Sequence, residues 1–227
     1  MTLQTEELVD TSPIAAGMPS TDLNSVWQAV RTEMRSRSND IHIPLSFAFA
    51  ERLCLAYPDA DALVVRVAIL LHDTGWARVD ETKIISEGFG ANWRQADIRF
   101  EHEIKGCDIA REVLPALGYD AAFVTKVTDI IDGHDTRAES YSIEDSLVRD
   151  ADRLWRFTAT GIALASGWFG QEPSAYCRRL RTDIVPELIT AAAHQMALAE
   201  LERAEALLQT SVLGSGIDAP ALDGSGA

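Results

Sequence analysis

Apolar residues recur at helical spacing along most of this chain, and the pattern predicts a protein built from α-helices. In the first such segment, a stripe that begins at Leu23 and ends at Met34 follows Asp22, a residue able to cap a helix. Further helices are predicted over residues 42–56, 62–71, 97–117, 120–134, 143–158, 173–183 and 184–209. The segment 62–71 is apolar on nearly all sides, which is typical of a central buried helix. Because no alternating strand pattern appears, we expect an all-α fold.

Turn and cap residues divide these helices from one another. Gly75 is expected to end or bend the central helix, and Asp120 to cap the helix that carries Phe123, Val127, Ile130 and His134 on one face. Residues 79–92 predict a loop with a helical turn, and a glycine-containing break is expected after residue 158. Pro186 suits the first turn of the last helix, which we expect to run unbroken from residue 184.

The two ends of the chain lack helical periodicity. Residues 1–21 mix Thr, Ser, Pro and Gly, and residues 210–227 are rich in Gly, Ser, Ala and Asp. Such compositions do not bury enough apolar surface to order a segment. We therefore predict a flexible leader over 1–21, a single helical domain over 22–209 and a flexible tail over 210–227.

Charge and composition narrow the classes of function. The 227 residues carry a formal charge of −15, which opposes binding to nucleic-acid polymers or anionic membranes but permits a small anionic substrate at a local cationic site. No apolar run reaches about 18 residues, and no basic and apolar leader suggests secretion. The three scattered cysteines form no disulfide framework or metal clip. These features predict a cytoplasmic protein.

The histidines carry the strongest chemical signal. Four of the five, His42, His72, His102 and His134, lie 30, 30 and 32 residues apart. Asp73 follows the second directly, and two further carboxylates lie in the stretch Asp150-Ala-Asp152. Imidazole and carboxylate together suit divalent iron, manganese, nickel or zinc. A single histidine on an apolar face is more often a core residue, but burying four of them without a metal would leave polar groups unsatisfied. We therefore predict a metal centre.

The stretch Ala68-Ile-Leu-Leu-His72-Asp73-Thr-Gly75, with His42 before it and Asp150-Ala-Asp152-Arg153-Leu154 after it, resembles the metal-dependent phosphohydrolases of the HD-domain superfamily. The resemblance covers roughly residues 40–157 and implies an all-helical bundle with the metal site in its core. It implies that His42, His72, Asp73 and Asp152 hold one metal. Helical spacing alone leaves Asp150 and Asp152 open, and the resemblance favours Asp152.

His102 and His134 are similar to the extra histidines of dinuclear HD proteins, in which Asp73 would bridge two divalent metal ions. One such subgroup contains phosphohydrolases, and the histidine spacings fit it better. Another contains mixed-valence diiron oxygenases of the inositol-oxygenase and phosphonate-oxygenase type, which remain an alternative. The pair Gly75-Trp76 departs from the Gly-Tyr-Pro triplet of the cyclic-dinucleotide phosphodiesterases. A third alternative is a non-catalytic binding domain that metal only stabilises.

The hydrolase hypothesis assigns further roles. Besides Asp73, the catalytic candidates are Asp135, beside a ligand, and Lys105, one helical turn after His102, either of which could act as a general acid. Arg78, Arg137 and Arg153 are candidates for binding a substrate phosphate, with solvated ion pairs as the alternative.

Smaller signals remain open. Arg178, Arg179 and Arg181 could grip an anionic group or only form a solvated helix face. His194 lies among alanines and is expected to be a packing residue. Trp76 and Trp155 could wall a substrate pocket or belong to the core. The apolar sides of the last helix could serve a homodimer as well as the core.

Overall fold

The computed structural model describes residues 9–14, 23–86 and 96–215, and within these ranges it contains helices and no strand. The all-α prediction is therefore confirmed. The α-helices are α1 (Asn24–Val30), α2 (Asn39–Ala56), α3 (Ala62–Leu71), α4 (Glu81–Ser86), α5 (Asp97–Ala116), α6 (Ala121–Ile131), α7 (Ile143–Leu154), α8 (Ala159–Trp168), α9 (Pro173–Arg179) and α10 (Ala191–Ser215). Shorter turns are η1 (Arg31–Arg35), η2 (Thr74–Arg78), η4 (Trp155–Phe157), η5 (Leu180–Ile184) and η6 (Val185–Glu187).

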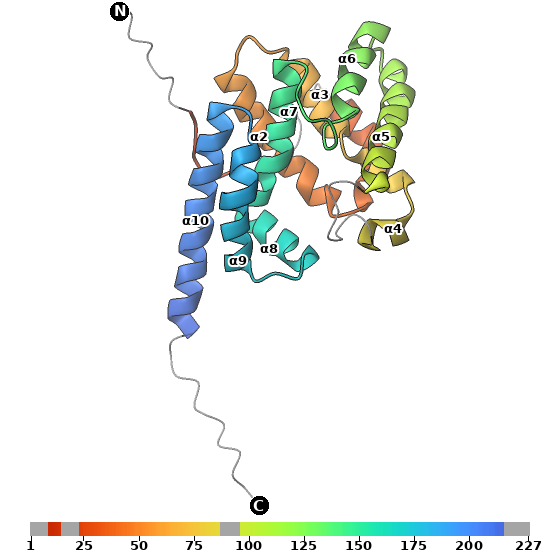
Figure 1. The fold of residues 1–227 in the computed structure, drawn as a ribbon. Helices are drawn as coiled ribbons and strands as arrows, with labels where there is room; N and C mark the ends of the chain where they lie inside the picture. The colour runs from red at the N-terminus through yellow and green to blue at the C-terminus, as the bar shows by residue number, and fades with distance from the viewer. Residues whose placement is uncertain (1–8, 15–22, 87–95, 216–227) are drawn as a thin grey trace, which may run out of the picture.

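Helix α3 lies at the centre of the bundle, as its apolar sequence predicts. It packs against α2, α6 and α7, and every residue from Val64 to Leu71 except Arg66 is buried. Figure 1 shows α5 and α6 on one side of this central group and α9 and α10 on the other. None of the helices in the described ranges is both long and apolar enough to cross a bilayer.

Side-chain caps set the starts of several helices. The Asp120 carboxylate accepts a hydrogen bond from the Phe123 N–H (2.8 Å), so the predicted cap of α6 is confirmed. Asp61, Ser142 and Thr158 cap α3, α7 and α8 in the same way. Asp22, the predicted cap of α1, lies outside the described residues.

Three predicted boundaries are wrong. The expected break after residue 158 contains α8, because the Thr158 hydroxyl accepts a hydrogen bond from the Gly161 N–H (2.9 Å) and starts a helix there. His134 does not share the face of α6, because the helix ends at Ile131 and Gly133 adopts a positive φ of 99°. The last helix is interrupted at η6, which contains Pro186, and resumes only at Ala191.

The predicted leader and tail also need correction. Part of the leader docks on the domain: the Ile14 N–H donates to Glu200 Oε1 (3.1 Å), and Arg52 donates to the Ser12 and Pro13 carbonyl oxygens. Helix α10 continues to Ser215, past the predicted start of the tail at residue 210. The other leader and tail residues, and residues 87–92 of the predicted loop, lie outside the described ranges.

Candidate metal centre

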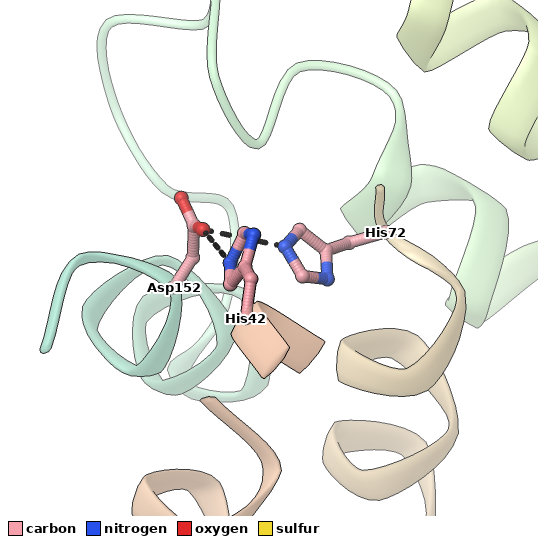
Figure 2. A group of neighbouring side chains, drawn as sticks. All are labelled: His42, His72 and Asp152. Atoms are coloured by element: carbon pink, nitrogen blue, oxygen red, sulfur yellow. Dashed lines mark hydrogen bonds and ion pairs between the residues drawn. The ribbon is translucent and has the colours of Figure 1, made fainter. Parts of the chain in front are cut away.

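His42, His72 and Asp152 meet in the core although they come from three different helices. His42 lies on α2, His72 follows the last turn of α3, and Asp152 lies on α7. Figure 2 shows the three side chains pointing toward one another. Asp152 Oδ1 lies 2.9 Å from His42 Nε2 and 3.3 Å from His72 Nε2. All three are almost fully buried.

Asp73 connects this group to a second pair of histidines. Its Oδ2 atom lies 3.2 Å from His42 Nδ1 and 3.9 Å from His72 Nε2. Its Oδ1 atom lies 3.4 Å from His102 Nε2 and 3.5 Å from His134 Nε2. The two Nε2 atoms of that pair are 3.4 Å apart. The six predicted ligands therefore converge, with one oxygen of Asp73 facing each half of the cluster.

Backbone carbonyls orient two of the imidazole rings. His72 Nδ1 donates to the Ile69 carbonyl oxygen, and His134 Nδ1 donates to the Ile131 carbonyl oxygen, both at 2.8 Å. In a neutral imidazole, a nitrogen that donates to a carbonyl carries the only proton, so the other ring nitrogen, Nε2, can offer its lone pair to a metal ion that displaces protons from the cluster. Metal-binding histidines are commonly held in this way.

Two tryptophans support the cluster from outside. Trp76 stacks on His102 with a centroid distance of 4.0 Å and donates from Nε1 to Asp73 Oδ1 (2.9 Å). Trp155 stacks on His42 with a centroid distance of 4.7 Å. Both indoles are buried, so they pack in the core and also contact predicted ligands.

Glu103 holds the turn that carries His134, and the sequence analysis did not identify it. It is 1% exposed, and its Oε1 atom accepts hydrogen bonds from the N–H groups of Asp135 (2.9 Å) and Thr136 (3.1 Å). Its Oε2 atom accepts from the Thr136 hydroxyl (2.6 Å). The sequence shows only that Glu103 follows His102 directly. Its hydrogen-bond partners are 32 residues or more away, so the sequence does not reveal them.

The electrostatics of the cluster favour positive charge. Burial alone would raise the pKa of Asp73, but His72 and the hydrogen bonds from His102 and other imidazoles hold this pKa well below its usual range. Burial likewise lowers the pKa of His134, yet Asp73 and the neighbouring acids outweigh it and raise the value to about 10. Protons therefore compete with a metal cation for the same imidazole and carboxylate atoms, which makes metal binding depend on pH.

The donor set fits a divalent metal ion. Within two of the three-ligand groups, His42–His72–Asp152 and His72–Asp73–His134, every side chain is buried and the donor atoms lie within 4.8 Å of one another. All the donors are imidazole nitrogen or carboxylate oxygen, which suits iron, manganese, nickel or zinc. The three cysteines are buried and free, and none belongs to these groups.

Asp150, the other carboxylate left open by helical spacing, has a different environment. Its Oδ1 and Oδ2 atoms accept hydrogen bonds from the N–H groups of Ile189 and Thr190, both at 2.8 Å. The side chain thus anchors the segment that leads into α10, whereas Asp152 faces the histidines.

Paired substitutions separate the roles of these two aspartates. In Asp152→Asn we expect the His42–His72 half of the centre to lose its metal, because the neutral amide is a poor ligand. In Asp150→Asn we expect full metal content and a free energy of unfolding lower by about 1–3 kcal/mol, because a buried charge-assisted hydrogen bond is lost. Elemental analysis and denaturant unfolding measure the two effects. An Asp150→Asn variant that loses metal while Asp152→Asn keeps it would reverse the assignment.

The two candidate general acids do not suit that role. Burial raises the pKa of Asp135, but its ion pair with Arg99 and the nearby His134 bring the pKa below its usual range, so the carboxylate has no proton to donate at neutral pH. Asp135 Oδ2 lies 3.8 Å from His102 Nε2, so the carboxylate places a negative charge beside this histidine. Lys105 is half-buried on α5 and does not line the cavity over the cluster.

The three candidate substrate arginines are engaged elsewhere or lie at the edge. Arg78 forms hydrogen bonds with both oxygens of Glu112 (3.0 and 2.9 Å) at the surface. Arg137 pairs with Asp145 (2.6 Å) and donates to the Asp129 carbonyl oxygen (3.2 Å), so it stabilises the turn after α6. Arg153 donates to the Arg149 carbonyl oxygen (2.9 Å) and borders a polar cavity beside Asp152. Neither Arg78 nor Arg137 lines the cavity over the cluster.

That cavity brings in cations that the sequence analysis missed. Arg37, Arg99 and Arg156 line it together with His42, Asp73 and Asp152. Trp155, Trp168 and Tyr176 supply aromatic walls from η4, α8 and α9. Arg156 lies one helical turn after Asp152, which was a readable signal, whereas nothing in the local sequence marks Arg37.

The remaining signals resolve into structural roles. Arg179 lies over the Phe169 ring (4.4 Å), Arg181 pairs with Glu205 (3.0 Å), and Arg178 is exposed. None of the three lines the cavity over the cluster. His194 Nε2 lies 3.0 Å from the Leu188 carbonyl oxygen, which agrees with a packing role.

Comparison with known proteins gives the same fold. The chain is similar in structure to a predicted HD superfamily hydrolase from an uncultured Thermotogales bacterium, with a TM-score of 0.56, 20% identity and coverage of 86% of this chain and 93% of the other. It is also similar to Bacillus subtilis YpgQ, solved in complex with ADP, with a TM-score of 0.53, 22% identity and coverage of 85% and 97%. Among curated proteins, no sequence matches.

The family model for the HD domain matches residues 40–156, about half of the chain, and this span begins just before His42 and ends just after Asp152. The chain therefore belongs to the HD-domain family.

Proposed function

We propose that this protein is a metal-dependent phosphohydrolase that acts on a small phosphate ester or nucleotide through a dinuclear centre. The observation that carries the proposal is the position of Asp73, whose two oxygens face two separate sets of histidines. A carboxylate placed between two ligand sets suits a bridge between two cations.

The ligands divide into two groups under this proposal. His42, His72 and Asp152 would hold one ion with Asp73 Oδ2, and His102 and His134 would hold the other with Asp73 Oδ1. When bound, the two ions would supply hydroxide near neutral pH and offset the negative charge of the phosphoryl group.

The residues around the centre would bind and enclose the substrate. Once metal ions neutralise the carboxylates of the same lining, the lining arginines would attract an anionic group in an otherwise acidic protein. The aromatic walls limit the access of water and offer flat surfaces to a planar group. The ADP bound to YpgQ, a structural relative of this chain, adds support for a nucleotide.

The test of the dinuclear centre is His102→Ala. We expect this variant to lose one of two metal ions and roughly 100-fold or more in activity, because the second cation no longer offsets phosphoryl charge. The fold should persist, since five of the six ligands and the main core are unchanged. Elemental analysis, circular dichroism and turnover on a panel of phosphate esters measure these effects.

His194→Ala is the matched control, because His194 is the one histidine outside the cluster. It should keep both metals and full turnover. A His102→Ala protein that retains two metals would contradict the second half of the centre. Wild-type protein that contains a diiron pair, consumes dioxygen and hydrolyses no ester would favour the oxygenase instead.

A further inference from the structure

Arg156 occupies an unusual position among the arginines near the metal centre. It lies in η4, one helical turn after Asp152, and lines both the cavity over the cluster and the adjoining polar cavity. Among the described residues its guanidinium has no hydrogen-bond or ion-pair partner, although the charges of Asp152, Asp135 and Asp73 act on it. A guanidinium always carries its charge in proteins, so Arg156 has donors available for an anion that enters the cavity.

The neighbouring arginines differ in this respect. Arg99 pairs with Asp135, and Arg153 donates to the Arg149 carbonyl oxygen and lies 3.9 Å from Glu187. Desolvating a cation costs free energy unless an anion compensates for it. Arg156 has no such direct partner, and its charge is offset only through space by Asp152, Asp135 and Asp73. Once metal ions neutralise these carboxylates, an anionic ligand would supply the compensation.

Arg37 contributes a second guanidinium to the same cavity. Its side chain lies over the Trp76 ring (4.1 Å), and Trp76 in turn contacts the ligands His102 and Asp73. The backbone reaches this position through consecutive left-handed residues, Arg37 with φ 52° and Ser38 with φ 57°. Such conformations cost about 1–2 kcal/mol per residue, and strain of this kind is concentrated at functional sites.

The charges in the cavity suit one class of substrate. Asp73 and Asp152 would be used by the metal ions, which leaves the positive charge of Arg156 for the substrate. Arg37 adds a second guanidinium to the same lining. At pH 7 a terminal phosphoryl group carries about −1.5 to −2 and three non-bridging oxygens, whereas a diester carries a single negative charge. Planar guanidinium groups bind such oxygens in pairs.

We propose that Arg156, together with Arg37, binds the non-bridging oxygens of a terminal phosphoryl group and thereby selects phosphomonoesters over phosphodiesters. This inference rests on the proposed phosphohydrolase function. It concerns residues beyond the metal-binding motif: Arg37 precedes the span matched by the family, and Arg156 is its last residue.

The test compares two chromogenic esters with the same aromatic leaving group, p-nitrophenyl phosphate and bis(p-nitrophenyl) phosphate. In metal-loaded Arg156→Met we expect kcat/KM for the monoester to fall roughly 10- to 100-fold, the value of a hydrogen bond to a charged group, while the diester changes little. Arg156→Lys keeps the charge without the paired donors and should lie between. Arg178→Met, at an exposed site on α9, should leave both rates unchanged.

Binding of inorganic phosphate, measured by calorimetry on the same metal-loaded proteins, separates this inference from the proposed function. Equal losses on both esters, or an unchanged monoester rate in a folded variant, would overturn the role of Arg156. If the wild type cleaves neither ester but binds phosphate in an Arg156-dependent way, the hydrolase proposal fails and the phosphate site stands. If the wild type cleaves neither ester and its phosphate affinity does not depend on Arg156, both fail. Should Arg156→Met not fold, Arg156→Lys decides by the same comparison.

Discussion

Replacing Asp73 with asparagine is expected to remove both metal ions and to lower hydrolysis at least about 1,000-fold, because the metals supply several kcal/mol of transition-state stabilisation. Within the part of the chain that the structure describes, Asp73 is the one side chain whose two oxygens face both halves of the cluster. Asparagine keeps the volume and can still accept the hydrogen bond from Trp76, so the change isolates the loss of charge and of one ligand oxygen.

Metal content and turnover measured together check this expectation. Asp129→Asn is a suitable control, because Asp129 is exposed on α6 and lies outside the cluster. It should retain both metals and normal activity. An Asp73→Asn variant with two bound ions would contradict the bridging role, and one with a single ion would assign Asp73 to one half alone.

Replacing Gly75 with alanine is expected to lower the free energy of unfolding by about 3 kcal/mol or more, the upper range for overpacking. A Cβ atom at this position would lie 1.9 Å from the His102 carbonyl oxygen and 2.5 Å from the Gly106 nitrogen. Both are backbone atoms of α5, so no side-chain rotation relieves the clash. The turn η2 and α5 would have to separate, which would also pull Asp73 away from His102 and weaken the second half of the centre.

Gly167→Ala is the matched control within the same protein. Gly167 lies in α8, and a Cβ atom there would have no neighbour within 4 Å. Alanine has a higher helix propensity than glycine, so this variant should be as stable as the wild type or more stable by up to about 1 kcal/mol. Denaturant unfolding and metal analysis compare the two. A Gly75→Ala protein of wild-type stability would show that η2 and α5 do not need this close approach.

The helical content could be predicted because its cause is local. Segment 62–71 is apolar on nearly all sides, and the structure buries most of it as α3 at the centre. Asp120 caps α6 as its position suggested, since a cap needs only the residues that follow it. The prediction failed where packing outweighed composition: Gly161 and Gly167 suggested a break, yet α8 forms there, capped by Thr158 and packed against η4 and α9.

The site divides in the same way. The histidine spacing and the His72-Asp73 pair singled out six side chains, and the fold brings them to one place. Spacing could not predict which arginines would line the site. Arg78, for example, pairs at the surface with Glu112, which is 34 residues away in the sequence. Spacing also could not show that Arg99 would fix Asp135 as an anion.

By itself the sequence determined the all-helical class, because periodicity and caps are properties of neighbouring residues. It also singled out the histidines and carboxylates, through their residue types and their resemblance to the HD-domain motif. Only the tertiary structure decided that Asp152 faces the cluster while Asp150 anchors the approach to α10. It alone placed Arg37 and Arg156 in the cavity. The physical reason is that the partner of a charged side chain depends on which helices pack together. Helix packing in turn depends on apolar contacts between residues from all parts of the chain.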